Sequence, residues 1–190
     1  MIYPIVAYGH PVLKKKAKEI DADYPNLKEI IANMFETMNE AIGIGLAAPQ
    51  VNLSIRLLVI DATPYEDDYP EAKGFKKVFI NPEILDESGE EWEFNEACLS
   101  LPGIAEFVTR KPTIRIRYQD ENFNTIEEEY DGVIARIFQH EYDHLEGILF
   151  VDRVSNLKKV LLKNKLKDIS TGKAKHAYKM TLPPVKRKTV

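Results

Sequence analysis

Two histidines and a glutamate lie within five residues, in the order His140-Glu141-Tyr142-Asp143-His144. Histidines four positions apart project from the same face of an α-helix, so both rings can bind one metal ion. Glu141 lies beside that face and can exchange a proton with a water on the ion without binding the ion itself. Neighbouring apolar residues indicate that both histidines face the interior, where two imidazoles without partners would be costly. The HExxH spacing therefore predicts a metal site.

A hydrolytic metal site needs three protein ligands and one open position, so a third ligand must come from elsewhere. The candidates are two downstream acids, Glu146 and Asp152, and Cys98, the one cysteine of the chain. Glu146 is only two residues beyond His144 and therefore points to another face of the helix. We favour Cys98, which lies in the segment 96–103 (EACLSLPG) directly after a strand-like stretch. A single cysteine also excludes an intrachain disulfide and a CxxC site.

The chain resembles the peptide deformylase family in three separate motifs. They are GIGLAAPQ at residues 43–50, EACLS at 96–100 and QHEYDHLEG at 139–147, and they occur in the family's order. The resemblance covers residues 1–165.

Two positions depart from the family's usual pattern. Ala97 and Asn52 stand where the family commonly has glycine. Asn tolerates a positive φ angle, whereas Ala would be strained by about 1 kcal/mol or more if its backbone needed one. Neither departure removes a group that does chemistry.

The resemblance implies that Cys98, His140 and His144 hold one divalent metal ion, with water in the fourth position. It implies Fe²⁺ as the native ion, and Zn²⁺, Ni²⁺ or Co²⁺ also suit this ligand set in purified samples. Glu141 is then the general base and acid, which takes a proton from the water and passes it to the leaving amine.

The implied substrate is the N-formyl-methionyl end of a newly made polypeptide, and the implied products are formate and a free amine. The Gln50 side-chain amide and the Leu99 backbone N–H match the family's positions for stabilising the oxyanion. Four further residues are expected to bind the peptide, three in a methionine pocket and one through its backbone: Ile44, Val133 and Ile137, and Gly45.

Two rival functions are weighed against deformylation. A zinc peptidase that cuts internal peptide bonds fits the HExxH motif alone, but it does not need the Cys98 and Gln50 motifs. A non-enzymatic relative could keep the fold to bind peptides or the ribosome. All the reacting groups are present, which argues against this second rival.

Hydrophobic periodicity predicts the elements that must position these residues. Apolar residues at steps of three and four predict a helix over 27–42, a second from Val133 to Ile148 around the HExxH motif, and a third, basic one over 156–167. Pro82 is expected to end one of the strands. The predicted strands cover five segments: 55–61, 77–81, 86–96, 113–118 and 123–130. We therefore expect an α+β fold with mainly antiparallel sheets packed around the central HExxH helix.

Length and composition fit one globular domain of 190 residues, with 44% apolar and 29% charged residues. The net charge of −4 gives no global attraction to nucleic acid or an anionic membrane. Charge is uneven, because residues 171–190 carry six Lys or Arg and no acid. We predict a catalytic domain over 1–168 and a basic tail over 169–190, flexible or docked on the surface.

No secretory signal or membrane-spanning run is visible in the sequence. We therefore expect a bacterial cytoplasmic protein with no membrane partner. We also expect a monomer that makes at most a transient contact with the ribosome.

Overall fold

The structure is a computed structural model, and it describes residues 1–184. The strands are β1 (Ile5–Val6), β2 (Gly45–Ala47), β3 (Leu57–Asp61), β4 (Lys76–Ser88), β5 (Trp92–Ala97), β6 (Ala105–Arg110), β7 (Thr113–Gln119), β8 (Thr125–Tyr130) and β9 (Met180–Thr181). The helices are α1 (Leu27–Glu40), α2 (Gly132–Leu145), α3 (Phe150–Arg153) and α4 (Asn156–Ser170). Among the residues described, no helix combines the length and the apolar composition that crossing a bilayer requires.

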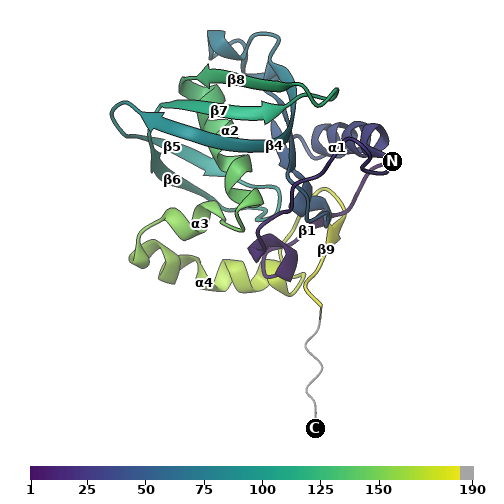
Figure 1. Ribbon diagram of the computed structural model, residues 1–190. Coiled ribbons are helices and arrows are strands. Elements are labelled where there is room, and N and C mark those ends of the chain that lie inside the picture. Colours follow the sequence, from purple (N-terminus) through teal and green to yellow (C-terminus); the bar gives the residue numbers. More distant parts are fainter. Residues whose placement is uncertain (185–190) are drawn as a thin grey trace.

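The main sheet has five strands in the order β2-β3-β4-β7-β8, and every neighbouring pair is antiparallel. Strands β5 and β6 form a separate antiparallel pair, and β1 pairs with β9 in parallel. Figure 1 shows α2 running down the middle of the molecule, behind β4 and β7. The predicted α+β class with mainly antiparallel sheets is confirmed.

Helix α2 is central because nearly all of its surface is covered. Twelve of its 14 residues are buried, which is typical of a helix enclosed on all sides rather than on one face. Its apolar side packs on the inner face of the main sheet, where the rings of Phe138 and Phe79 lie 5.1 Å apart. The burial of both HExxH histidines, predicted from their apolar neighbours, follows from this position.

Strand β4 is longer than predicted, because Pro82 does not end it. The pairing of β4 with β7 shifts register between Ile80 and Glu83. At such an irregularity the ladder does not need the N–H that proline lacks. The Pro82 carbonyl instead accepts a hydrogen bond of 2.7 Å from Arg56 Nη2.

Strand β6 was not predicted at all. The predicted strand over 86–96 is in fact two elements, the end of β4 and all but the last residue of β5, separated by a turn at Gly89. In β6 the more buried positions are Glu106, Val108 and Arg110. Two of these three are charged, so the apolar alternation that reveals a half-buried strand is missing from the sequence.

Helix α1 ends at Glu40, two residues before the predicted end. Ile42, rather than one of the glycines that follow, adopts the left-handed conformation, with φ of +57°. Its side chain is 92% exposed. A β-branched residue is strained in this conformation, so the end of α1 stores strain at the surface.

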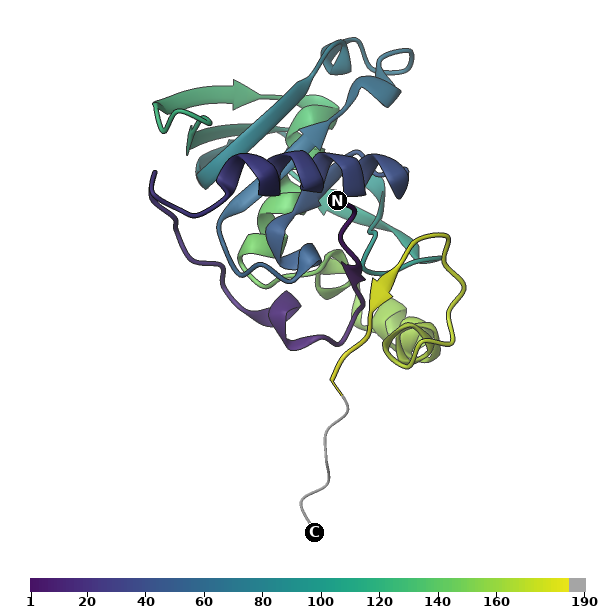
Figure 2. The same ribbon diagram turned by 90° about the vertical axis from the view of Figure 1, so that its right-hand side faces the viewer.

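The C-terminal extension is docked on the domain as far as the structure describes it. Ile169 at the end of α4 is buried in the core, so the predicted boundary at residue 168 lies inside that helix. The chain then turns back, and β9 lies beside β1 (Figure 2). Residues 185–190 of the predicted basic tail lie outside the described residues.

Candidate metal centre

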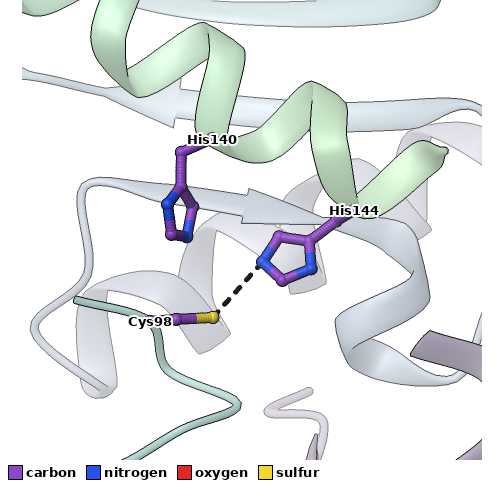
Figure 3. A group of neighbouring side chains, drawn as sticks. All are labelled: Cys98, His140 and His144. Atoms are coloured by element: carbon purple, nitrogen blue, oxygen red, sulfur yellow. Dashed lines mark hydrogen bonds between the residues drawn. The ribbon is translucent and has the colours of Figure 1, made fainter. Parts of the chain in front are cut away.

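Three buried ligand atoms converge on one point: the sulfur of Cys98 and one ring nitrogen each of His140 and His144 lie within 4.8 Å of one another. The two rings project from successive turns of α2, and Cys98 meets them from the loop that follows β5 (Figure 3). Cys98 Sγ and His144 Nε2 are 3.2 Å apart. Ligands of a tetrahedral ion lie roughly 3.3–3.7 Å from one another. The geometry and the thiolate–imidazole chemistry both fit one transition-metal ion.

The two acids considered as third ligands lie elsewhere. Glu146 forms ion pairs with Arg56 at 2.6 Å and with Lys16 at 2.9 Å. Asp152 pairs with Lys14. The structure thus brings Cys98, and neither acid, to the histidines.

His140 is oriented by a buried carboxylate. Its Nδ1 lies 2.8 Å from Glu96 Oε2, which leaves Nε2 for an ion. Burial alone would raise the pKa of Glu96, but the hydrogen bonds from Arg110 and His140 outweigh burial and hold that pKa well below its usual range. Glu96 is therefore ionised in the interior of the protein.

Glu96 belongs to a buried cluster of charges that the sequence analysis missed. Arg110 donates to both Glu96 oxygens, at 2.8 and 2.9 Å, and to Asp143 Oδ2 at 2.7 Å. Arg136 of α2 donates to Glu96 Oε1 at 3.0 Å and to the Val108 carbonyl at 2.8 Å. The cluster ties β5, β6 and α2 together directly beside two of the metal-ligand candidates. One residue could have indicated this cluster from the sequence: Arg136 is a charged residue in an apolar stretch, one helical turn before His140.

Glu141 presents an unsatisfied carboxylate oxygen beside the three ligand atoms. Its Oε2 is buried and makes no hydrogen bond to any of the described residues. Burial raises the pKa of Glu141 to about 7, against the lowering effect of His140. A Cβ atom at Gly45 would lie 2.5 Å from Glu141 Oε1, so only glycine at that position leaves room for the carboxylate.

Gln50 lies in a 3-10 turn (Ala48–Val51) that directs its side chain to the same point. Its Oε1 accepts a hydrogen bond of 2.8 Å from the Ala47 N–H. This bond fixes the amide, so Nε2 faces the centre and lies 3.5 Å from Cys98 Sγ.

A cavity of about 760 Å³ lies over these groups. The predicted site residues that line it are Ile44, Gly45, Gln50, Cys98, Leu99, Ile137, His140 and Glu141. His144 and Val133 do not line it; both are fully buried, and Val133 belongs to the core between α2 and the main sheet. Residues 176–178 of the C-terminal extension also line the cavity, which the sequence analysis did not predict.

The two departures from the family pattern have different backbones. Asn52 follows the 3-10 turn with a φ of +65°, a conformation that asparagine tolerates. Ala97 ends β5 in extended backbone and has no positive φ, so alanine is unstrained there.

Comparison with known proteins agrees with this geometry. The sequence profile of the polypeptide deformylase family matches residues 2–160. The peptide deformylase of Flavobacterium psychrophilum is 55% identical, and the match covers 98% of this chain and all of the relative. The solved peptide deformylase of Legionella pneumophila superposes with a TM-score of 0.79 at 36% identity, covering 93% of this chain and all of that one. That of Thermotoga maritima gives 0.73 at 42% identity, covering 82% and 99%. The chain therefore belongs to the peptide deformylase family, whose enzymes remove the N-formyl group from newly made polypeptides.

Proposed function

We propose that this chain deformylates N-formyl-methionyl peptides at a centre formed by Cys98, His140 and His144, with one Fe²⁺ ion as the native metal. The main support is that these three buried ligand atoms converge below a cavity. They lie next to Glu141, whose Oε2 makes no hydrogen bond to the described residues. A divalent ion at this position lowers the pKa of water and so supplies hydroxide at neutral pH.

Glu141 moves the proton in this proposal. A pKa of about 7 suits a group that must both accept and release a proton near neutral pH. Its Oε2 takes the proton from the attacking water and then delivers it to the departing amine nitrogen. The buried setting keeps bulk water from competing for that proton.

Two N–H donors stabilise the negative charge that develops on the formyl oxygen. One is Gln50 Nε2, held by the bond from the Ala47 N–H. The other is the Leu99 backbone N–H, which donates to no other group among residues 1–184. A donor of this kind contributes roughly 3–4 kcal/mol to lowering the barrier.

The peptide pairs with the edge of the main sheet that borders the cavity. Strand β2 is the edge strand of the main sheet, so the backbone of Gly45 has one side free to pair with an extended chain. Ile44 and Ile137 line the cavity and supply apolar surface for the methionine side chain. Val133 lies in the core and takes no part in this proposal.

We further propose that the enzyme is a monomer of the bacterial cytoplasm, where formylated chains leave the ribosome. The division into a catalytic region, 1–168, and a basic extension, 169–190, stays a prediction. Any ribosome contact is assigned to the extension, whose charge of +6 over 171–190 contrasts with an acidic body. Deleting residues 185–190 should weaken co-sedimentation with ribosomes, and unchanged co-sedimentation would contradict this assignment.

The assay that tests the function compares two peptides that differ only in the formyl group. A formyl-Met tripeptide should release formate and a free amine, whereas the unformylated tripeptide should stay intact. Cleavage of an internal bond without formate release would identify the rival peptidase instead. With Fe²⁺ bound, activity should decay in air, because iron and the thiolate are both open to oxidation.

A further inference from the structure

The C-terminal extension turns back after α4 and contacts the loop that carries Cys98. The Tyr178 hydroxyl donates a hydrogen bond of 2.7 Å to the Leu99 carbonyl, across 79 positions of sequence. Tyr178 also lines the cavity. It lies beyond residues 2–160, the region that the family profile matches. The family profile therefore assigns it no role.

Two consecutive carbonyls of this loop are held from outside the loop. The Leu99 carbonyl accepts from Tyr178, and the Ser100 carbonyl accepts from the Tyr8 backbone N–H at 2.9 Å. Both donors come from chain ends that are remote in sequence. Inside the loop the Leu101 N–H donates to the Cys98 carbonyl at 2.9 Å, and the two outside bonds add to this turn by holding the next two carbonyls.

The two donors, Tyr178 and Tyr8, lie close to the paired strands β9 and β1. The Ile5 N–H donates to the Lys179 carbonyl at 2.8 Å, and the Ala7 N–H donates to the Thr181 carbonyl at 2.9 Å. Tyr178 directly precedes Lys179 of the first bond. Tyr8, whose N–H donates to Ser100, directly follows Ala7 of the second. Figure 2 shows the two strands side by side. The β1–β9 pair therefore acts as a clamp on the Cys98 loop.

We propose that Tyr178 is a positioning residue for deformylation, which holds the Leu99 backbone so that its N–H points at the developing oxyanion. The inference rests on the proposed role of Leu99. The Cys98–Leu99 peptide lies between two fixed points, the cysteine sulfur and the Leu99 carbonyl. The Leu99 N–H shares its peptide plane with the Cys98 carbonyl, which accepts a hydrogen bond of 2.9 Å from the Leu101 N–H. Tyr178 holds the next plane, between Leu99 and Ser100, so loss of its bond lets Leu99 rotate and its N–H tilt.

The test replaces Tyr178 by Phe, which removes the hydroxyl and keeps the ring and the β1–β9 pairing. Tyr24→Phe is the matched control, because it removes a hydroxyl from a half-buried tyrosine that does not line the cavity. Both variants and the parent enzyme are loaded with metal and assayed with a formyl-Met tripeptide.

Tyr178→Phe should lower kcat by about 5- to 10-fold. A Leu99 N–H that is tilted away from the oxyanion loses part, but not all, of its contribution to stabilising the transition state. KM should change less than about 2-fold, since the oxyanion exists only in the transition state. Metal content and Tm should match those of Tyr24→Phe.

Two results would overturn the inference alone. One is a kcat for Tyr178→Phe equal to that of the control, and the other is a loss of kcat that parallels loss of bound metal or of Tm. A parent enzyme that binds metal but releases no formate would overturn the proposed function, and this inference with it.

Discussion

The floor and one wall of the cavity are built in different ways. The floor consists of α2 and the Cys98 loop. One of its metal-ligand candidates, His140, is braced by a buried cluster in which Glu96 contacts Arg110, Arg136 and His140. The wall formed by residues 176–178 depends on one hydroxyl and a two-residue strand pair. Several contacts therefore hold the candidate site residues of the floor, whereas the wall holds the Cys98 loop through one side-chain hydrogen bond, from Tyr178 to Leu99.

The largest expected effect comes from the floor. Glu141→Gln keeps the shape of the side chain but cannot accept a proton, so kcat should fall by about 10³-fold. Metal content should be unchanged, because Glu141 is not one of the three ligand candidates. Formate release and metal analysis on the same sample check both expectations, and unchanged turnover would remove Glu141 from the mechanism.

The second largest effect is expected from Glu96, which holds His140 and two buried arginines in the floor. Glu96→Gln removes the negative charge that pairs with two buried arginines, and loss of one partner from a buried ion pair costs about 3–5 kcal/mol. Metal affinity should fall by about 10- to 100-fold, because His140 loses its carboxylate partner. Urea unfolding and metal titration measure the two losses.

The stability loss in Glu96→Gln should depend on pH in a defined direction. The pKa of Glu96 is lower in the folded than in the unfolded protein, so its contribution is complete above the ordinary value of 4.5. It is lost as the pH falls below that value toward the folded pKa. The parent and Glu96→Gln should therefore converge in acid, and a gap that widens below pH 4.5 would contradict the assignment of charge.

Tyr178→Phe gives the third effect, a 5- to 10-fold change confined to kcat as set out above. Its comparison with Glu96→Gln sharpens the contrast between the two regions. The floor variant should lose stability and metal together, whereas the wall variant should lose neither.

The smallest effect is a gain in stability at the cavity mouth. Ile42 has a φ of +57°, which costs a β-branched residue about 1 kcal/mol or more. Asparagine tolerates this conformation, so Ile42→Asn should raise Tm by about 2–4 °C. Calorimetry of the metal-loaded protein checks this, with an exposed isoleucine in ordinary backbone, Ile2→Asn, as the control. An unchanged or lower Tm would show that the backbone is unstrained.

The sequence predicted the site residues that stand in short motifs, where the spacing along the chain follows from the chemistry. His140 and His144 are one helical turn apart, and Cys98 and Gln50 stand in motifs of their own. Burial of the pair could be predicted because α2 is apolar around it.

The missed features depend on tertiary pairing. Arg110 occupies an inward position of β6 only because Glu96 and Asp143 neutralise it, and this charge hid the strand from periodicity. Pro82 was expected to end β4, whereas a shift in register accommodates it. The contact between Tyr178 and Leu99 spans 79 positions and has no local pattern.

One measurement addresses the metal-dependent removal of a formyl group directly. Protein purified without oxygen is analysed for metal and assayed with a formyl-Met tripeptide, before and after the ion is removed by a chelator. We expect one divalent ion per chain, formate and free amine in equal amounts, and loss of both products on chelation that is reversed by Fe²⁺. Formate release that persists in the metal-free protein would contradict the account.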